Sequence, residues 1–329
     1  MPAVCRTDRP PLRGGGGPCK SGAGVKVAII RNPVSGGRSG QAGWLRVRRE
    51  LDRHFPAIEE HETVAGGTPL LARRIVEAGV DLVIAVGGDG TISEVADGIL
   101  SSSRPDTPLA FVPAGTGGDF ARNFDLPRQP AAIAEAIARA PVRKVDAGFL
   151  RCRAEDGATT GRHFINIASF GVSGEVVRSV NAAERGGWLP GSLRFFVHSL
   201  RSILRYRPRG VRLVLDGREV HAGPVTTVAV ANGGWFGGGM HVAPAADLSD
   251  GLFEVAVLGG APTLETLMLL QKIYSGAHVG DPKVHFYRAR SVLAEPLDDR
   301  PALLEADGET PGSIAASFEM KPAALTLKI

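Results

Sequence analysis

A glycine-rich pentapeptide, Gly87-Gly88-Asp89-Gly90-Thr91, is the sequence feature with the clearest chemistry. It follows a continuous apolar run at residues 81–86, which is typical of a strand buried on both faces, and a helical pattern follows it. Glycines let backbone N–H groups close around a phosphate, and the start of a helix favours an anion. Asp89 is the single charged side chain of the loop and suits a network of magnesium and water. Taken alone, the loop could equally be a tight turn without a ligand.

Two further turn clusters follow predicted strands in the same half of the chain. They are Asn32-Pro33-Val34-Ser35-Gly36-Gly37, after the strand predicted at 25–30, and Pro113-Ala114-Gly115-Thr116-Gly117-Gly118, after the strand predicted at 109–112. In an open parallel sheet such loops lie together at the carboxyl edge, where ligands bind. The spacing is neither that of a P-loop nor that of a dinucleotide fingerprint. Three coincident loops favour a phosphate-binding edge over three turns without a ligand.

The order of the predicted elements indicates the fold class. Strand, glycine loop and helix alternate over residues 25–147, which is typical of a parallel sheet covered by helices. We therefore expect an α/β N-terminal domain there, a Rossmann-like parallel sheet with glycine-rich loops. The length of 329 residues also favours two domains.

Residues 148–329 have a different character. Short strand candidates, the first at 163–167, alternate with Asp-Gly hairpin turns at 216–217 and 307–308. We expect a mainly antiparallel β-sandwich with two inserted helices, at about 192–206 and 263–277. The last strand either stays in this sandwich or returns to the first domain.

The composition excludes several classes of protein. Hydrophobic residues make up 43% and charged residues 22%, as in an ordinary globular chain. No apolar stretch approaches the ~18 residues of a spanning helix. Cys5, Cys19 and Cys152 are scattered and form no C-x-x-C pair, which excludes a disulfide scaffold and a zinc ribbon. The chain therefore fits a reducing compartment, and we expect a cytoplasmic protein.

Residues 1–24 are expected to form a disordered tail, or to follow from a start codon placed too early. They contain four consecutive glycines, scattered prolines and no apolar segment of a signal peptide. Four basic residues against one acid give this segment +3 of the chain's net charge of +4, which leaves +1 for residues 25–329. A nearly neutral folded part does not favour a nucleic-acid partner.

Together these motifs resemble the diacylglycerol kinase and sphingosine kinase superfamily, in its bacterial soluble lipid-kinase branch. The loops that begin at Asn32, Gly87 and Pro113 resemble its three nucleotide loops, in the right order. Later matches are Ala231-Asn232-Gly233, Gly237-Gly238-Gly239-Met240 with Pro244, Asp250-Gly251-Leu252 and Asp307-Gly308-Glu309. The family usually has asparagine where this chain has Gly118, and the lost amide could weaken nucleotide binding or shift substrate choice.

The resemblance implies an ATP-dependent lipid kinase that uses Mg²⁺ and phosphorylates a lipid hydroxyl, with a diacylglycerol-type acceptor expected first. Residues 25–147 would then be the nucleotide-binding catalytic domain and 148–329 the lipid-substrate domain. The implied nucleotide-binding residues are Asn32, Pro33, Val34, Ser35, Gly36, Thr63, Gly87, Gly88, Asp89, Gly90, Thr91, Ile92, Ser93 and Thr116. The implied catalytic residues are Asp307, as general base, and Asp89; a structural magnesium would be held by Asp247, Asp250 and the carbonyl of Leu252.

Without the resemblance, two of these assignments have simpler explanations. Asp307-Gly308 reads as an ordinary hairpin turn, and Asp247 and Asp250 read as a solvated loop. Two rival functions also remain open. One is a NAD kinase-like phosphotransferase, whose Gly-Gly-Asp-Gly-Thr loop is similar, and the other is a catalytically inactive lipid-binding protein of the same fold.

The predicted helix at 192–206 is basic on one face and apolar on another. The basic face holds Arg194, His198, Arg201 and Arg205, and further arginines follow at 207, 209 and 212. Such a helix can lie on anionic lipid, so we expect peripheral contact with a membrane surface. A core helix with a solvated basic face would give the same pattern. A homodimer is a further alternative on which the sequence does not decide.

Overall fold

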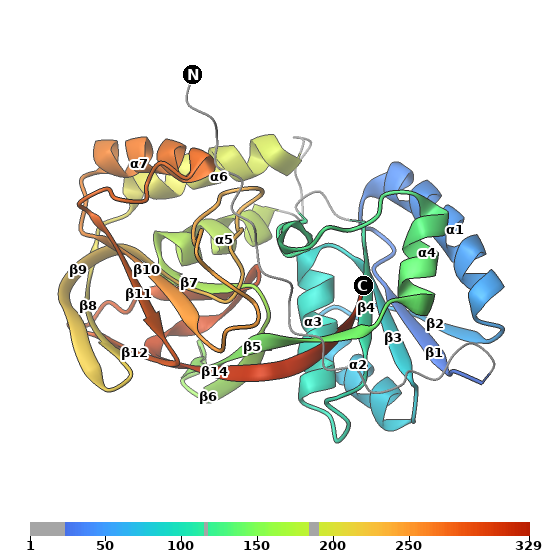
Figure 1. Cartoon of the computed structure of the whole chain (residues 1–329). Helices are drawn as coiled ribbons and strands as arrows, with labels where there is room; N and C mark the ends of the chain where they lie inside the picture. The colour runs from blue at the N-terminus through green and yellow to red at the C-terminus, as the bar shows by residue number, and fades with distance from the viewer. Residues whose placement is uncertain (1–23, 115–117, 184–190) are drawn as a thin grey trace.

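The computed structural model describes residues 24–114, 118–183 and 191–329. Figure 1 shows two lobes: the N-terminal half of the chain forms one, most of the C-terminal half forms the other, and two long strands run between them. Within the described residues, no helix combines the length and the apolar character needed to cross a membrane.

The N-terminal lobe is built on four parallel strands in the order β2-β1-β3-β4. They are β1 (Val27–Arg31), β2 (Ile58–Glu62), β3 (Leu82–Gly87) and β4 (Leu109–Pro113). Their side chains alternate between two buried faces, as the period of a strand requires. One face packs on α1 (Gly37–His54) and α4 (Pro130–Arg139), and the other on α2 (Thr68–Glu77) and α3 (Asp89–Leu100).

The C-terminal lobe consists of antiparallel strands around one apolar core. After β5 (Val142–Arg153) the strands are β6 (Thr159–Phe164), β7 (Ile167–Gly171), β8 (Arg209–Leu215), β9 (Arg218–Ala231), β10 (Phe253–Gly259), β11 (Val284–Ala289), β12 (Ser291–Pro296), β13 (Leu303–Ala306) and β14 (Glu309–Lys328). In the core, the rings of Phe164 and Phe253 stack with their centroids 5.7 Å apart. Such rings bury a large apolar area, and the stacked pair adds to the stability of this lobe.

Strands β5 and β14 join the two lobes into one sheet. They pair with each other over most of their length, and β14 also pairs with β13 and β12. At its end β14 reaches the N-terminal lobe, where Leu327 lies beside Leu109 of β4 in a parallel pair. The lobes are therefore linked through continuous backbone hydrogen bonding. The turn between β13 and β14 lies near the carboxyl edge of the parallel strands, where Asp307 contacts Ser93 of α3.

The prediction of two inserted helices is wrong, because the described C-terminal half has three. The predicted helices correspond to α6 (Gly191–Arg205) and α7 (Thr263–Ser275), and α5 (Val172–Ala183) is the additional one. The sequence does not predict α5, because the glycine at 174 lies in its first turn and glycine has a low helix propensity. A Cβ at Gly174 would lie 2.4 Å from the carbonyl oxygen of Leu303, so glycine is needed there for packing against the neighbouring segment.

Candidate active site

The glycine loops of the N-terminal lobe meet the β13–β14 turn of the C-terminal lobe at a cavity of about 640 Å³. Most of the nucleotide-binding residues predicted from the sequence contribute to its lining: Asn32, Val34, Ser35, Gly36, Gly88, Asp89, Gly90 and Thr91. The predicted base, Asp307, lines the same cavity, as does Asp119, which follows the third loop.

The start of helix α3 opens directly into this cavity. Asp89 is its first residue, and the first intrahelical hydrogen bond runs from the N–H of Ile92 to the carbonyl of Gly88, at 3.1 Å. The N–H groups before Ile92 therefore have no partner within the helix, which is the arrangement that attracts phosphate. A Cβ at Gly90 would meet nothing within 4 Å, so the space beside this backbone is open.

Asp89 organises the loops around this helix start. Its carboxylate accepts hydrogen bonds from the backbone N–H groups of Asp119, at 2.9 Å, and Phe120, at 3.1 Å. The side chain predicted to serve magnesium therefore also fixes the segment that follows the third loop. It retains acceptor capacity, because a carboxylate offers about four lone-pair sites.

The first loop lies against the second and the third. The amide of Asn32 donates to the hydroxyl of Thr91, at 3.4 Å, and its carbonyl oxygen accepts from the N–H of Val34. Gly36 has a φ of 69°, and a Cβ there would lie 2.1 Å from the carbonyl oxygen of Ala114. This close approach of two backbones requires glycine.

Asp307 is held by four donors, from both lobes. Its Oδ2 accepts from the hydroxyl of Ser93, at 2.6 Å, and from the N–H of Ile165, at 2.8 Å. Its Oδ1 accepts from the N–H groups of Asn166, at 3.1 Å, and Ile167, at 3.0 Å. These bonds explain why the strand predicted at 163–167 is broken between Phe164 and Ile167, since the N–H groups there bond to a side chain. Burial nevertheless raises the pKa of Asp307, although its hydrogen bonds act in the opposite direction.

Glu305, two residues before Asp307, is the second carboxyl group of this strand. It is 1% exposed, and burial raises its pKa to about 8. Its Oε1 lies 2.5 Å from the hydroxyl oxygen of Ser169, which in turn lies 2.7 Å from that of Ser173. The hydroxyls of Ser169 and Ser173 therefore form a row of hydrogen bonds that ends at Glu305.

The cavity is acidic throughout its described lining. The carboxyl groups of Asp89, Asp119, Glu305, Asp307 and Glu309 line it, and no lysine, arginine or histidine is among the described lining residues. Asp119 is 6% exposed, its pKa is raised by burial, and its Oδ1 makes no hydrogen bond to any described group, although Nε of Arg122 lies 3.3 Å away. A polyphosphate would be repelled here unless a cation lay between it and the carboxylates. The donor set of hard oxygens suits Mg²⁺.

The other predicted nucleotide residues that the structure describes do not line the cavity. Ile92 is buried in the core, and Ser93 reaches Asp307 from α3. Thr63 follows β2 and donates its N–H to the carbonyl of Arg31, at 2.9 Å. Pro33 and Gly87 are absent from the lining. Thr116 lies outside the described residues.

At Gly118, where the family usually has asparagine, the backbone has a φ of 66° and a Cβ would meet nothing within 4 Å. This is a left-handed conformation that glycine and asparagine both adopt. The backbone at this position therefore accommodates either residue.

The predicted structural metal residues lie in a tight loop before β10. Oδ1 of Asp250 accepts from the N–H of Leu252, at 2.9 Å, and Oδ2 forms an ion pair with Arg288. Oδ1 of Asp247 accepts from the N–H and hydroxyl of Ser249. The described residues contain no cluster of three or more His, Cys, Asp or Glu side chains that could hold a metal. A cation at Asp250 would have to compete with Arg288.

An apolar cavity in the C-terminal lobe adjoins the cavity lined by Asp307, which is the candidate catalytic cavity. It lies between α5, α6, α7 and the sheet, and its lining includes Val176, Ile203, Met240, Leu258, Leu269 and Ile273. A second cavity of about 330 Å³, between α6 and α7, shares Ser199, Met240 and Leu270 with it. Phe236 lines both the apolar and the catalytic cavity, and Ser169 of the apolar cavity contacts Glu305 of the catalytic one.

Sequence reasoning gave no role to Asp119 or Glu305. Glu305 could have been noticed because it is the only charged residue in the apolar strand at 302–306. Burying a carboxylate costs free energy unless it is hydrogen-bonded or protonated. Asp119 gave less signal, because its partner, the N–H of Gly238 at 2.6 Å, is 119 residues away.

Comparison with known proteins assigns both halves of the chain. Residues 26–150 match the diacylglycerol kinase catalytic domain, and residues 166–329 match the YegS C-terminal NAD kinase beta sandwich-like domain. A diacylglycerol kinase of Mycobacterium tuberculosis is 32% identical over 307 residues, which cover 91% of this chain and 94% of the relative. A diacylglycerol kinase of Bacillus subtilis is 27% identical over 295 residues, covering 89% and 92%.

The fold agrees with these matches. A crystal structure of a diacylglycerol kinase from Bacillus anthracis superimposes with a TM-score of 0.66 at 20% identity, covering 92% of this chain and 96% of that one. The chain therefore belongs to the diacylglycerol kinase family and is a lipid kinase.

Proposed function

We propose that the chain transfers the γ-phosphoryl group of ATP to the hydroxyl of a diacylglycerol-type lipid. The observation that carries the proposal is the shared cavity, in which two glycine loops of the N-terminal lobe and Asp119, which follows the third loop, lie together with Asp307, beside the apolar cavity. In this scheme residues 25–147 act as a Rossmann-like nucleotide-binding domain and residues 148–329 as the lipid-substrate domain.

The phosphates would lie over the start of α3, between Gly36 and Gly90. Mg²⁺, when bound, would neutralise the charge that develops on the transferred phosphoryl group. Asp89 and Asp119 are the residues best suited to hold it, directly or through water, because both lie in the cavity beside the helix start. Gly90 leaves the backbone N–H groups accessible to the phosphate oxygens.

Asp307 would accept the proton of the acceptor hydroxyl. Its four donors occupy the roughly four lone-pair sites of a carboxylate, so one of them must give way. Ser93 is the side-chain donor among them and can rotate, whereas the three backbone N–H groups are fixed. We therefore propose that the lipid hydroxyl takes the position of the Ser93 hydroxyl against Oδ2. The raised pKa of Asp307 makes it a stronger base than an exposed aspartate.

The acyl chains would lie in the apolar cavity between α5, α6, α7 and the sheet, and in the second cavity between α6 and α7. The inner end of the apolar cavity carries the hydroxyls of Ser169, Ser173 and Thr227, next to Glu305, and would receive the polar end of the lipid. Ser199 also lines this cavity, and its buried hydroxyl has no hydrogen bond within the described structure. A ligand that is apolar along its length and polar at one end fits this lining.

The outer faces of α6 and α7 would contact the membrane that supplies the lipid. Leu204 on α6, and Leu264, Met268 and Tyr274 on α7, are more than half exposed, an unusual density of large apolar side chains for two short helices. This arrangement supports peripheral association at the cytoplasmic surface. A homodimer stays a prediction.

We also retain Asp247, Asp250 and the carbonyl of Leu252 as proposed ligands of a second, structural Mg²⁺. Asp146 already orders this region, because its carboxylate accepts the N–H groups of Gly251, at 2.7 Å, and Ala323, at 2.6 Å. A bound ion would add to that order once Arg288 leaves Oδ2 of Asp250.

The proposal is tested by incubating the protein with radiolabelled ATP, Mg²⁺ and a total lipid extract, and by identifying the labelled product by mass spectrometry. Labelled phosphatidic acid supports it. NAD offered as acceptor in a parallel reaction tests the rival phosphotransferase, which predicts labelled NADP. A lipid-binding protein without activity would label neither.

A further inference from the structure

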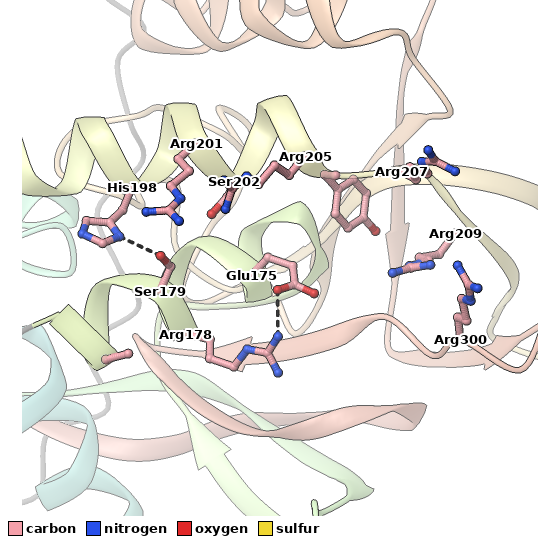
Figure 2. A pocket seen from close by; sticks show the side chains of 12 residues that line it. Glu175, Arg178, Ser179, His198, Arg201, Ser202, Arg205, Arg207, Arg209 and Arg300 are labelled. Atoms are coloured by element: carbon pink, nitrogen blue, oxygen red, sulfur yellow. Dashed lines mark hydrogen bonds and ion pairs between the residues drawn. The ribbon is translucent and has the colours of Figure 1, made fainter.

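A strongly basic pocket of about 780 Å³ lies between α5 and α6, apart from the three cavities described above. Figure 2 shows Arg201 and His198 pointing from α6 toward Arg178, Ser179 and Glu175 on α5. Its lining holds the arginines Arg178, Arg201, Arg205, Arg207, Arg209 and Arg300, with Glu175 as the one acid. Since the chain from residue 25 onward carries only +1 in total, positive charge is strongly concentrated here.

Among the described residues, only one of the six pocket arginines forms an ion pair. Arg178 pairs with Glu175, at 3.0 Å. In the described part of the chain the other pocket arginines have no ion pair, and Arg209 lies over the ring of Tyr206, 5.9 Å from its centroid. The buried hydroxyl of Tyr206 has no hydrogen bond to any described group and lines the same pocket. Several guanidinium groups without an ion pair among the described residues therefore surround a buried hydroxyl donor, which is a donor set suited to an anion.

We propose that this pocket binds a phosphate group, presented by the head group of an anionic membrane lipid. Guanidinium groups bind phosphate oxygens through paired N–H donors, and several of them along one pocket favour a phosphate over a lone carboxylate. The volume is large enough for a head group with its glycerol. The lipid source follows from the surroundings, because α6 also carries the exposed Val197 and Leu204, which would lie against the same membrane surface.

Helix α5 connects this pocket to the catalytic cavity. Arg178 and Ser179 face the pocket, and Ser179 lies 2.6 Å from Nδ1 of His198 on α6. Val177 and Asn181 of the same helix line the catalytic cavity, and the Asn181 amide donates to the carbonyl of Gly308, at 3.1 Å. A head group bound between α5 and α6 would therefore fix the helix that supports the Asp307-Gly308 turn.

The binding half of the proposal is tested without any catalytic assay. The variant Arg201→Gln/Arg205→Gln/Arg209→Gln is compared with Arg46→Gln/Arg49→Gln/Arg74→Gln, which removes equal charge from exposed positions of α1 and α2. Sedimentation with phosphatidylcholine vesicles containing phosphatidic acid should weaken about a hundredfold for the pocket variant and only a few-fold for the control. Tyr206→Phe, a milder change that keeps the charge, should weaken binding about fivefold.

Calorimetry with inorganic phosphate and with glycerol 3-phosphate distinguishes the sources of the phosphate. Much tighter binding to the vesicles assigns the pocket to a lipid head group. Saturation by inorganic phosphate with no added affinity for vesicles assigns it to free phosphate. Equal losses in the pocket and control variants, with no effect of Tyr206→Phe, would overturn the proposal.

The coupling half rests on the proposed kinase function. Turnover of a short-chain diacylglycerol is measured with and without added phosphatidic acid vesicles. The wild-type protein should be stimulated, and Asn181→Ala should bind the vesicles normally while its stimulation falls toward one. Normal vesicle binding without any lipid phosphorylation would contradict the proposed function and leave the pocket standing. Undiminished stimulation of Asn181→Ala would exclude α5 as the connection.

Discussion

The hydroxyl of Ser93 donates a hydrogen bond to Oδ2 of Asp307, at 2.6 Å, across 214 residues of sequence. Ser93 belongs to the helix whose start faces the phosphate loops, and Asp307 to the turn that closes the catalytic cavity from the other lobe. This contact therefore joins the proposed nucleotide site to the proposed base. If Asp307 is the base and Ser93 only occupies the position of the lipid hydroxyl, mutation of each residue should have a different effect on turnover.

Gly90→Val tests the phosphate site. The new side chain projects into open space, so the fold should tolerate it, and helix propensity favours valine over glycine by a few tenths of a kcal/mol. ATP affinity, measured by calorimetry, should fall by at least about tenfold because the side chain occupies the phosphate position. Gly43→Val is the matched control, since Gly43 also lies in a helix with open space around it but outside the cavity. Unchanged ATP affinity in Gly90→Val would remove the phosphate from the start of α3.

Asp250→Ala tests the second metal. If Asp247, Asp250 and Leu252 hold Mg²⁺, the melting temperature of the wild-type protein should rise with Mg²⁺ concentration, because binding to the folded state alone stabilises it. That rise should be smaller in Asp250→Ala, which keeps only the site in the cavity, and should persist in full in Asp299→Ala, which removes an exposed carboxylate elsewhere in the C-terminal lobe. If the melting temperature of the wild-type protein does not change with Mg²⁺ concentration, Arg288 and Asp146 stabilise this loop without a metal ion.

Glu305 should make the stability of the fold fall as the pH rises. Burial raises its pKa from the ordinary 4.5 to about 8, so the folded state holds a proton that the unfolded state releases between these values. The stabilisation is complete below pH 4.5 and is lost as the pH rises toward 8, by at most about 1.4 kcal/mol per pH unit. Asp307, whose pKa is also raised, acts in the same direction.

Denaturant unfolding at a series of pH values measures this dependence. Glu305→Gln, which mimics the protonated group, should be about as stable as the wild-type protein at pH 5 and more stable at pH 8. The control Glu155→Gln, at an exposed loop, should follow the wild-type curve. Parallel curves for Glu305→Gln and the wild-type protein would mean that Glu305 is ionised in the folded state.

Leu270→Trp tests the acceptor cavity. Leu270 lines both apolar cavities between α6 and α7, and a larger ring would fill the space proposed for the acyl chains. The rate on a long-chain diacylglycerol should fall by about tenfold or more, with ATP affinity unchanged. Leu264→Trp, on the same helix but exposed and outside the cavities, should keep nearly full activity. Equal activity of the two variants would place the acceptor elsewhere.

The sequence predicted local features better than distant contacts. The three loops could be found because each consists of adjacent glycines after an apolar strand. The Asp307-Gly308 turn is also predictable from its residue types, and its φ values of 49° and 89° are those of a tight hairpin. The donors to Asp307 could not be predicted, since Ile165 to Ile167 lie about 140 residues away and become its partners only through the fold.

The basic helix shows the same limit. Periodicity correctly places Arg201 and Arg205 on one helical face, and the sequence leaves open whether that face lies on a membrane or is the solvated side of a core helix. In the structure Arg201 and Arg205 line the basic pocket against α5, a helix that the sequence does not predict. Where a helix face points depends on the partner that covers it, and periodicity alone does not identify that partner.

The most direct test of the lipid-kinase account compares phosphate transfer from ATP to diacylglycerol by the wild-type protein, Asp307→Asn and Ser93→Ala. The wild-type protein should form phosphatidic acid. Asp307→Asn should lose about 10²–10⁴-fold in turnover while binding ATP almost normally, because the asparagine amide cannot accept the proton. Ser93→Ala should keep most of the turnover, since the lipid hydroxyl takes its place. An Asp307→Asn variant with near wild-type turnover, or equal losses in both variants, would contradict the account and reduce Asp307 to a structural link between the lobes.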